Sequence, residues 1–247
     1  MKVIKEIKEV VASNTVKNVA KNYYQSVVET FKLEPLDAIN RIRSLMDLPG
    51  TIRDGIFFEC FENYILRLNE YDFEKKQFER NNLKKLMELL AAVSPNEEAG
   101  YLGNSDQLRE YSKRIVKLID DCGTIEKAVY LANVSRAFVK ESIDRNTFFK
   151  LGQCIRLLTD EDLIFLKENV KMGVISDGAY IDDFRGQGLM YDVDGGFAYT
   201  KRAFELLKYG LAYESNATIP ETFLDRNVIS FATNDDISEM FECCDKL

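Results

Sequence analysis

Apolar residues recur at helical spacing through the proline-free stretch between residues 111 and 169. They occur every three or four positions, which places their side chains on one face of a helix. The set comprises Tyr111, Ile115, Leu118 and Ile119, then Ala128, Leu131, Val134, Ala137, Phe138 and Ile143, then Phe148, Leu151, Ile155, Leu158, Leu163 and Leu166. The pattern predicts three or four helices that bury these faces against one another.

Capping residues mark the breaks between these helices. Gly123 and Thr124 combine a helix stop with an N-cap. Asp144 and Thr159 stand where further N-caps are expected, and Thr159 is followed by Asp162 at the spacing of a capping box. The loops are therefore short, which favours antiparallel neighbours and predicts a helical bundle.

The first third of the chain predicts further helices. Residues 2–31 read as one long amphipathic helix, and a second begins at Pro35. Residues 51–69 form a third that is rich in aromatic residues, which we interpret as core packing rather than a ligand site. Residues 71–93 are charged at first and then apolar, which predicts a partly solvated helix with i,i+4 ion pairs.

The pattern changes after residue 172. Two short extended pieces flank Asp194-Gly195-Gly196, which is a β-hairpin signal. Ser176 and Asp177 are expected to cap a short helix before the hairpin, and Thr200 a helix after it. This order resembles the wing of a winged-helix module followed by a packing helix.

We therefore predict a mainly α protein, a helical bundle with a small C-terminal winged-helix-like β-hairpin element. Its expected parts are an N-terminal amphipathic helix (residues 1–34), the helical bundle (35–171), the winged-helix-like element (172–215) and an acidic tail with a short strand and helix (216–247).

The composition limits the kinds of catalysis and metal binding that we expect of this protein. The chain has 247 residues and no histidine, which removes the usual general base and most transition-metal sites, so we do not expect an enzyme or a cofactor. Its five cysteines are scattered without a CxxC pair, which predicts reduced structural thiols and no metal site. Asp192 and Asp194 have the spacing of calcium ligands, but Gly196 stands where the next acidic ligand belongs, which favours a turn.

Charge points to the kind of partner. The net charge of −8 falls on residues 173–247, which hold 14 acidic and 6 basic residues, whereas the rest of the chain is balanced. An acidic surface suits a protein partner with a basic surface and opposes phosphate contacts, so nucleic acid is not expected. The candidate partner-binding residues are Asp177, Asp182, Asp183, Asp192 and Asp194.

Other hypotheses stay open. One is a winged-helix-like transcriptional regulator that binds DNA, motivated by the hairpin pattern and opposed by the local charge. Another is a carboxylate-based enzyme or nucleotide sensor that uses Asp182, Asp183 and Tyr191, although adjacent residues of a helix point in different directions.

Residues 2–31 could lie on a membrane surface or form a homodimer, but docking on the bundle is favoured. No apolar run is long enough to span a bilayer and no signal peptide begins the chain, which predicts a soluble cytoplasmic protein.

Four segments together resemble a known family. They are residues 48–58, 114–120, 161–166 and 188–191, with Tyr199 and Thr200 downstream. Their order and spacing resemble a family of uncharacterised helical proteins of Gram-positive bacteria and their mobile elements. The resemblance implies an intracellular, mostly helical protein with a wing-like C-terminal element and a link to phage, prophage or the conflict between them. It implies no catalytic residues, and the N-terminal helix and the acidic tail lie outside it.

Overall fold

The structure is a computed structural model that describes residues 33–46, 55–91, 104–176, 178, 180–213, 217–220 and 223. The elements in chain order are α2 (Pro35–Met46), α3 (Gly55–Leu68), β1 (Tyr71–Asp72), β2 (Gln77–Phe78), α4 (Asn82–Ala91), α5 (Asn104–Asp120), α6 (Ile125–Val139), α7 (Arg145–Leu157), α8 (Asp160–Asn169), α9 (Ile181–Gly186), β3 (Met190–Val193), β4 (Gly196–Tyr199), α10 (Lys201–Leu206) and the π-helix η1 (Leu207–Leu211). The predicted fold class is confirmed, because these ranges are mainly helical and a small hairpin lies near their C-terminal end.

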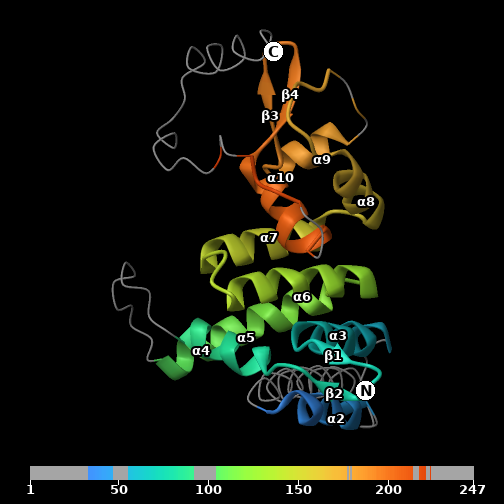
Figure 1. The fold of residues 1–247 in the computed structure, drawn as a ribbon, viewed down its shortest axis with the longest axis vertical. Helices are drawn as coiled ribbons and strands as arrows, with labels where there is room; N and C mark the ends of the chain where they lie inside the picture. Colours follow the sequence, from blue (N-terminus) through green and yellow to red (C-terminus); the bar gives the residue numbers. More distant parts are fainter. Residues whose placement is uncertain are drawn as a thin grey trace, which may run out of the picture.

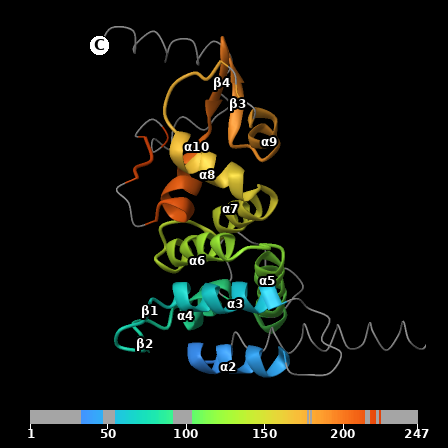
Figure 2. The same cartoon turned by 90° about the vertical axis from the view of Figure 1, so that its right-hand side faces the viewer.

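The elements stack along the long axis of the molecule. Helix α2 lies at one end, α3 to α7 occupy the middle, and α9 with the β3–β4 hairpin lies at the other end (Figure 1). The same order is visible after a quarter turn (Figure 2). The molecule is therefore elongated, and the β1–β2 and β3–β4 hairpins lie in different halves of the stack.

Helix α6 is the centre of this stack. Eleven of its fifteen residues are buried, because it packs on α3 on one side and on α7 and η1 on the other. The buried side chain of Asn133 accepts a hydrogen bond from Nε of Arg67 (2.8 Å) and donates one to the carbonyl oxygen of Gly210 (2.9 Å). This amide thereby joins α3, α6 and η1.

The predicted caps of the central helices are confirmed. The Thr124 and Asp144 side chains accept hydrogen bonds from the backbone N–H groups three residues on. Thr159 and Asp162 form the reciprocal capping box. Gly123 has a φ of +71°, the left-handed conformation that ends a helix.

The aromatic residues of α3 form core packing, as expected. Phe57, Phe58, Phe61 and Tyr64 are each at most 5% exposed. The Tyr64 hydroxyl lies 2.8 Å from Oγ of Ser135, which in turn donates to the carbonyl oxygen of Leu131. Tyr64 therefore donates to Ser135, and α3 is tied to α6 by a satisfied polar contact inside the apolar core.

The prediction of a single helix over residues 71–93 is wrong. Residues 71–78 form the β1–β2 hairpin, in which Tyr71 pairs with Phe78, and only Asn82–Ala91 is helical. The Asp72 side chain accepts hydrogen bonds from the N–H groups of Glu74 and Lys75 and so closes a turn. An i,i+4 ion pair does form in this segment, between Lys75 and Glu79, but it lies across the hairpin rather than along a helix.

The second hairpin is confirmed and is extended by one bridge. Strands β3 and β4 pair in register from Met190–Tyr199 to Val193–Gly196, and Ile175 forms a bridge with Phe197. Thr200 precedes α10 as expected, but its hydroxyl donates to the carbonyl oxygen of Gly188 instead of capping the helix. Tyr180, rather than Ser176 or Asp177, is the N-cap residue of α9.

Several predictions concern parts outside the described residues. They are the helix over residues 2–31, the strand and the last helix of the tail, and the position of Asp177.

Candidate functional site

The structure places four of the five predicted partner-binding aspartates at one end of the stack. Asp182 and Asp183 lie on α9, Asp192 lies on β3, and Asp194 is in the turn between β3 and β4. All four side chains are exposed, and that of Asp182 is 97% exposed. Asp177 lies outside the described residues.

Arg185 lies among these acidic residues. Its guanidinium is 2.9 Å from the carboxylate of Asp192 and 3.7 Å from that of Asp182, and it also lies over the ring of Phe197. Two of the aspartates therefore share one positive charge, whereas Asp183 and Asp194 form no ion pair within the described residues. The sequence contained Arg185, but its central position depends on how α9 packs on the hairpin.

The residues of the enzyme hypothesis lie near a pocket that the structure describes, but outside its lining. Asp182 and Asp183 face solvent, and Tyr191 is half-buried on β3, where burial raises the pKa of its hydroxyl. None of the three lines the pocket that the structure shows nearby between α8, α9 and the hairpin.

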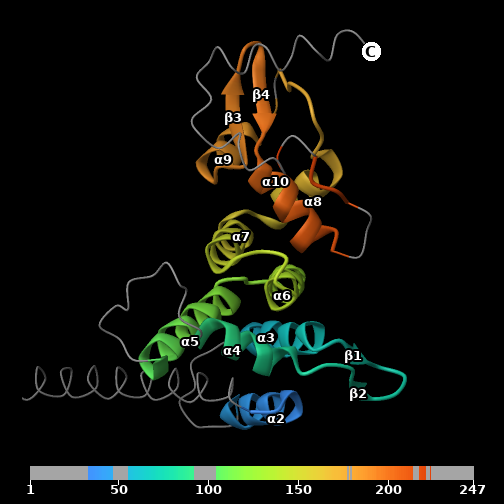
Figure 3. The same cartoon turned by 60° about the vertical axis from the view of Figure 1, so that its left-hand side comes forward.

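The β1–β2 hairpin is an additional candidate site that the sequence analysis missed. It extends sideways from the stack, beside α3 and α4 (Figure 3). Two amides hold its base, since Asn82 donates to the carbonyl oxygen of Leu68 (2.7 Å) and Asn69 accepts from the N–H of Leu83 (2.8 Å). Asn69 and Asn82 are both buried, so the base of the hairpin is fixed to the body.

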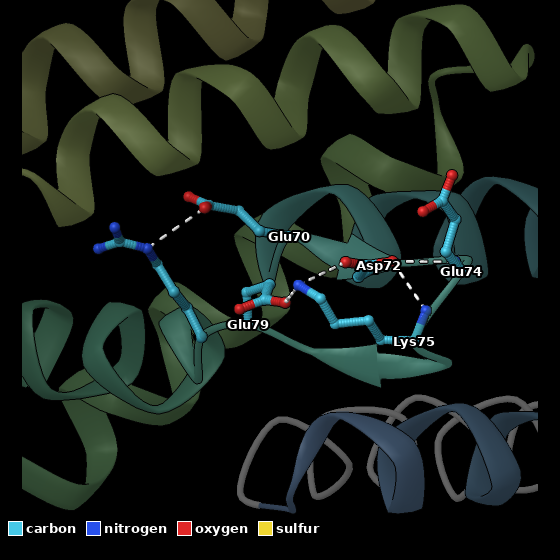
Figure 4. Close-up of polar contacts among 6 residues, drawn as sticks. Glu70, Asp72, Glu74, Lys75 and Glu79 are labelled. Carbon is cyan, nitrogen blue, oxygen red and sulfur yellow. Dashed lines mark hydrogen bonds and ion pairs between the residues drawn. The ribbon is translucent and has the colours of Figure 1, made fainter.

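Charged side chains brace the rest of the hairpin (Figure 4). Nζ of Lys75 lies 2.9 Å from a carboxylate oxygen of Asp72 and 2.9 Å from one of Glu79. Glu70 lies 3.2 Å from Nε of Arg80 and 2.8 Å from the Arg136 guanidinium on α6. The Lys75 N–H and ammonium hold the pKa of Asp72 below its usual value, and the Asp72 and Glu79 carboxylates raise the pKa of Lys75.

Phe73 is an exposed aromatic residue of this hairpin. It lies in the turn between β1 and β2, and 74% of it is exposed, although its ring meets that of Tyr71 edge to face with centroids 5.0 Å apart. Tyr71 in turn contacts Phe78 across the strands. The exposed ring is thus presented by a turn of defined conformation. The signal in the sequence was Tyr71 and Phe78 flanking a turn-forming aspartate.

The cysteines that the structure describes are structural. Cys60, Cys122 and Cys154 are buried, free thiols, and burial raises their pKa to about 11, 12 and 11. They are therefore protonated at neutral pH and are poor nucleophiles and ligands. In the described part of the chain, no group of three or more acidic or cysteine side chains is arranged to hold a metal ion.

The helices of the described ranges include none of the length and apolarity needed to cross a bilayer. No protein-family model, no curated protein and no solved structure matches this chain. The family resemblance of the four segments accordingly stays a prediction.

Proposed function

We propose that this protein is a protein-interaction module that contacts its partner through the turn of the β1–β2 hairpin, with Phe73 as the anchor residue. The observation that supports this proposal is the 74% exposure of an aromatic ring in a braced turn. Aromatic side chains are enriched among the residues that dominate binding energy, and burying one removes a large apolar surface from water.

These contacts within the turn matter because a flexible loop loses conformational entropy when a partner orders it, and this loss weakens binding. A loop that is already held by Asp72, Lys75 and Glu79 has less conformational freedom to lose on binding. These charged side chains belong to the same hairpin as Phe73, and a polar rim is the usual surrounding of an anchor residue in a protein interface.

The acidic residues that we expect to contact a basic surface of the partner lie at the other end of the stack. There Asp183 and Asp194 are the exposed carboxylates that Arg185 does not pair with. We include in the proposal a separate, electrostatic contact between these carboxylates and the partner. Such a contact increases the rate at which the two proteins associate more than it increases their affinity.

Site-specific cross-linking tests the anchor. The photoreactive residue p-benzoylphenylalanine replaces Phe73 in one variant and Ile164, which is 52% exposed on α8, in a matched control. We expect a discrete protein adduct from position 73 that unlabelled protein competes away, and none from position 164. Equal adducts at the two positions, or none at 73, would contradict the proposal. Because the resemblance implies a link to phages, the cross-linking is done in Gram-positive cells with and without phage infection.

Once a partner is identified, substitutions separate the two contacts. Phe73→Ala should weaken binding by about 30-fold or more, the effect of losing an anchor worth about 2 kcal/mol. Neutralising Asp183 and Asp194 together with Asn should mainly slow association at low salt. A partner that tolerates Phe73→Ala but not the aspartate changes would show that the acidic end is the main interface.

A further inference from the structure

A polar connection crosses helix α6 between the base of the β1–β2 hairpin and the π-helix η1. Arg67, in the last turn of α3, donates a hydrogen bond to the Asn133 side chain, which in turn donates to the carbonyl oxygen of Gly210. Asn133 is only 4% exposed. Breaking either hydrogen bond would leave a buried polar group without that partner, so the end of α3 and η1 are held by the same side chain.

A second connection runs beside the first, one turn further along α6. The guanidinium of Arg136 lies 2.8 Å from the carboxylate of Glu70 and 4.7 Å from the centre of the Tyr213 ring. Because Arg136 is 7% exposed, its charge needs partners inside the protein, and this carboxylate and this ring are two of them. Each of the three residues follows its counterpart in the first connection by three positions, the spacing of neighbours on a helix.

Glu70 is the end of this second connection at the hairpin. Its φ of +54° is uncommon for a residue with a side chain, so the surrounding contacts have to maintain it. Its second carboxylate oxygen lies 3.2 Å from Nε of Arg80, and its carbonyl oxygen accepts the N–H of Glu79. Both of these partners follow β2. A displacement of Arg136 would therefore affect both ends of the hairpin.

The hydrogen-bond register of η1 differs from that of α10, the α-helix before it. The N–H of Ala212 donates to the carbonyl oxygen of Leu207, five residues back, whereas an α-helix uses the carbonyl four residues back. Such π-turns are rare and are frequent at functional sites. The α-helical register would rotate Tyr213 by about 100° around the helix axis and move its ring away from Arg136. The two connections across α6 thus favour the π register.

We propose that Arg136 positions the β1–β2 hairpin and couples it to the register of η1, which thereby regulates binding through Phe73. This inference rests on the proposed function. In the π register, Glu70 and Tyr213 hold the guanidinium between them. In the α-helical register the ring is lost, water reaches the guanidinium and screens its attraction to Glu70, and the hairpin opens more often. A ligand that prefers one register of η1 would shift the hairpin accordingly.

Amide hydrogen exchange of the full-length protein without a partner tests the coupling. Tyr213→Leu removes the contact of the ring with the guanidinium. Tyr209→Leu is the matched control, because Tyr209 is also a half-buried tyrosine but the cation over its ring is Lys208 of η1 itself. The reporter is the N–H of Glu79, which closes the hairpin. We expect Tyr213→Leu to raise its exchange rate by about 5-fold, at the low end of couplings between sites, and Tyr209→Leu to leave it unchanged.

A general loss of stability would raise exchange throughout the chain, so a distant amide is followed as well. The N–H of Ile175, which donates to the carbonyl oxygen of Phe197 at the other end of the stack, should keep its rate in both variants. In an Arg136→Met background, Tyr213→Leu should have no further effect on the hairpin reporter, because the residue that transmits the change is absent.

Coupling between two sites also acts in the opposite direction. Glu70→Gln should therefore raise the exchange rate of the Ala212 N–H in η1 by a similar factor. The proposal is overturned if Tyr213→Leu leaves the hairpin reporter unchanged, if the control variant or the distant amide responds equally, or if the effect persists without the arginine. None of these results requires a partner, so a failure here is distinct from a failure of cross-linking at position 73, which tests the proposed function.

Discussion

The guanidinium of Arg185 lies 2.9 Å from the carboxylate of Asp192 and links helix α9 to strand β3. The pair is exposed, at 43% for Arg185 and 66% for Asp192, so water and salt weaken it. We expect Asp192→Asn to lower the free energy of unfolding by about 0.5 kcal/mol at low salt, and by less at high salt. Urea denaturation at two salt concentrations measures this.

Asp183→Asn is the matched control, because Asp183 is an exposed carboxylate of the same region that Arg185 does not reach. It should leave stability unchanged. Equal losses in the two variants would mean that the contact between Arg185 and Asp192 contributes no specific stability.

Gly196 holds the second hairpin against Ile175. Its φ is +154°, and a Cβ atom at this position would overlap the carbonyl oxygen of Ile175. Because that oxygen accepts the N–H of Phe197, Gly196→Ala should displace the bridge and cost more than about 2 kcal/mol. Thermal unfolding of the variant checks this expectation.

Two other glycines separate backbone strain from steric overlap. Gly195 has a φ of +82° and open space around it, so Gly195→Ala should cost about 1 kcal/mol from strain alone. Gly186 lies in α9 with neither constraint, and Gly186→Ala should be neutral or slightly stabilising. If Gly195→Ala proves as costly as Gly196→Ala, the contact with Ile175 is not the cause.

The central helices could be predicted because their signals are local. Periodic apolar residues bury one face, and Thr124, Asp144 and Thr159 satisfy N–H groups within three residues of themselves. Such contacts require no knowledge of the rest of the fold. The turn at Asp194 and Gly195 was predictable for the same reason.

The β1–β2 hairpin shows where this reasoning fails. Lys75 and Glu79 are four residues apart, and their pairing is compatible with a helix and with a tight hairpin. Whether a helix or a hairpin forms depends on Asn69 and Asn82, whose side chains form hydrogen bonds to the end of α3 and the start of α4. These hydrogen bonds form only when the two helices have come together in the folded chain. The exposure of Phe73 follows from that geometry and could not be read from its position in the sequence.

The pocket between α8, α9 and the β3–β4 hairpin depends even more on tertiary packing. The pocket gathers Phe165 from α8, Phe184 from α9 and Tyr199 from β4, which are separated by up to 34 positions in the sequence. Each of them separately has the spacing of an ordinary core residue. What distinguishes Tyr199 is a hydroxyl without a partner, and this is a property of the assembled structure.

The carboxylate of Asp72 should titrate at a pKa below its usual 3.8. The first cause is the N–H of Lys75, and the second is the ammonium of the same residue. Because the folded-state pKa is lowered, the carboxylate stabilises the hairpin above pH 3.8, and this contribution is lost as the pH falls through the folded-state value. NMR titration of the Asp72 side-chain carbon measures the pKa directly.

Lys75→Met tests which cause dominates. It keeps the N–H but removes the ammonium, so the pKa of Asp72 should rise only part of the way back to 3.8. Glu79 is the internal control, since the Lys75 ammonium is the first cause of its lowered pKa and its value should recover further. A complete return of Asp72 to 3.8 would show that the turn hydrogen bond has no effect on the carboxylate.

The three buried thiols should be unreactive in the native protein. Burial raises the pKa of Cys60 and Cys154 to about 11 and that of Cys122 to about 12, so the thiolate fraction at pH 8 is on the order of one in a thousand or less. A variant with Cys243→Ser and Cys244→Ser leaves these three as the only cysteines of the chain. An aromatic disulfide reagent should then detect no thiol at pH 8 within minutes, and three after unfolding in guanidinium.

The same thiols make stability depend on alkaline pH. The unfolded chain releases their protons near pH 9, whereas the folded chain retains them until about pH 11, so the stabilising contribution is present below pH 9 and is lost as the pH rises above it. Replacing Cys122 by Ala should reduce this alkaline loss, at the expense of some packing at all pH values. If a native thiol instead reacts rapidly at pH 8, that cysteine is accessible, and its nucleophilic chemistry becomes part of what this protein can do.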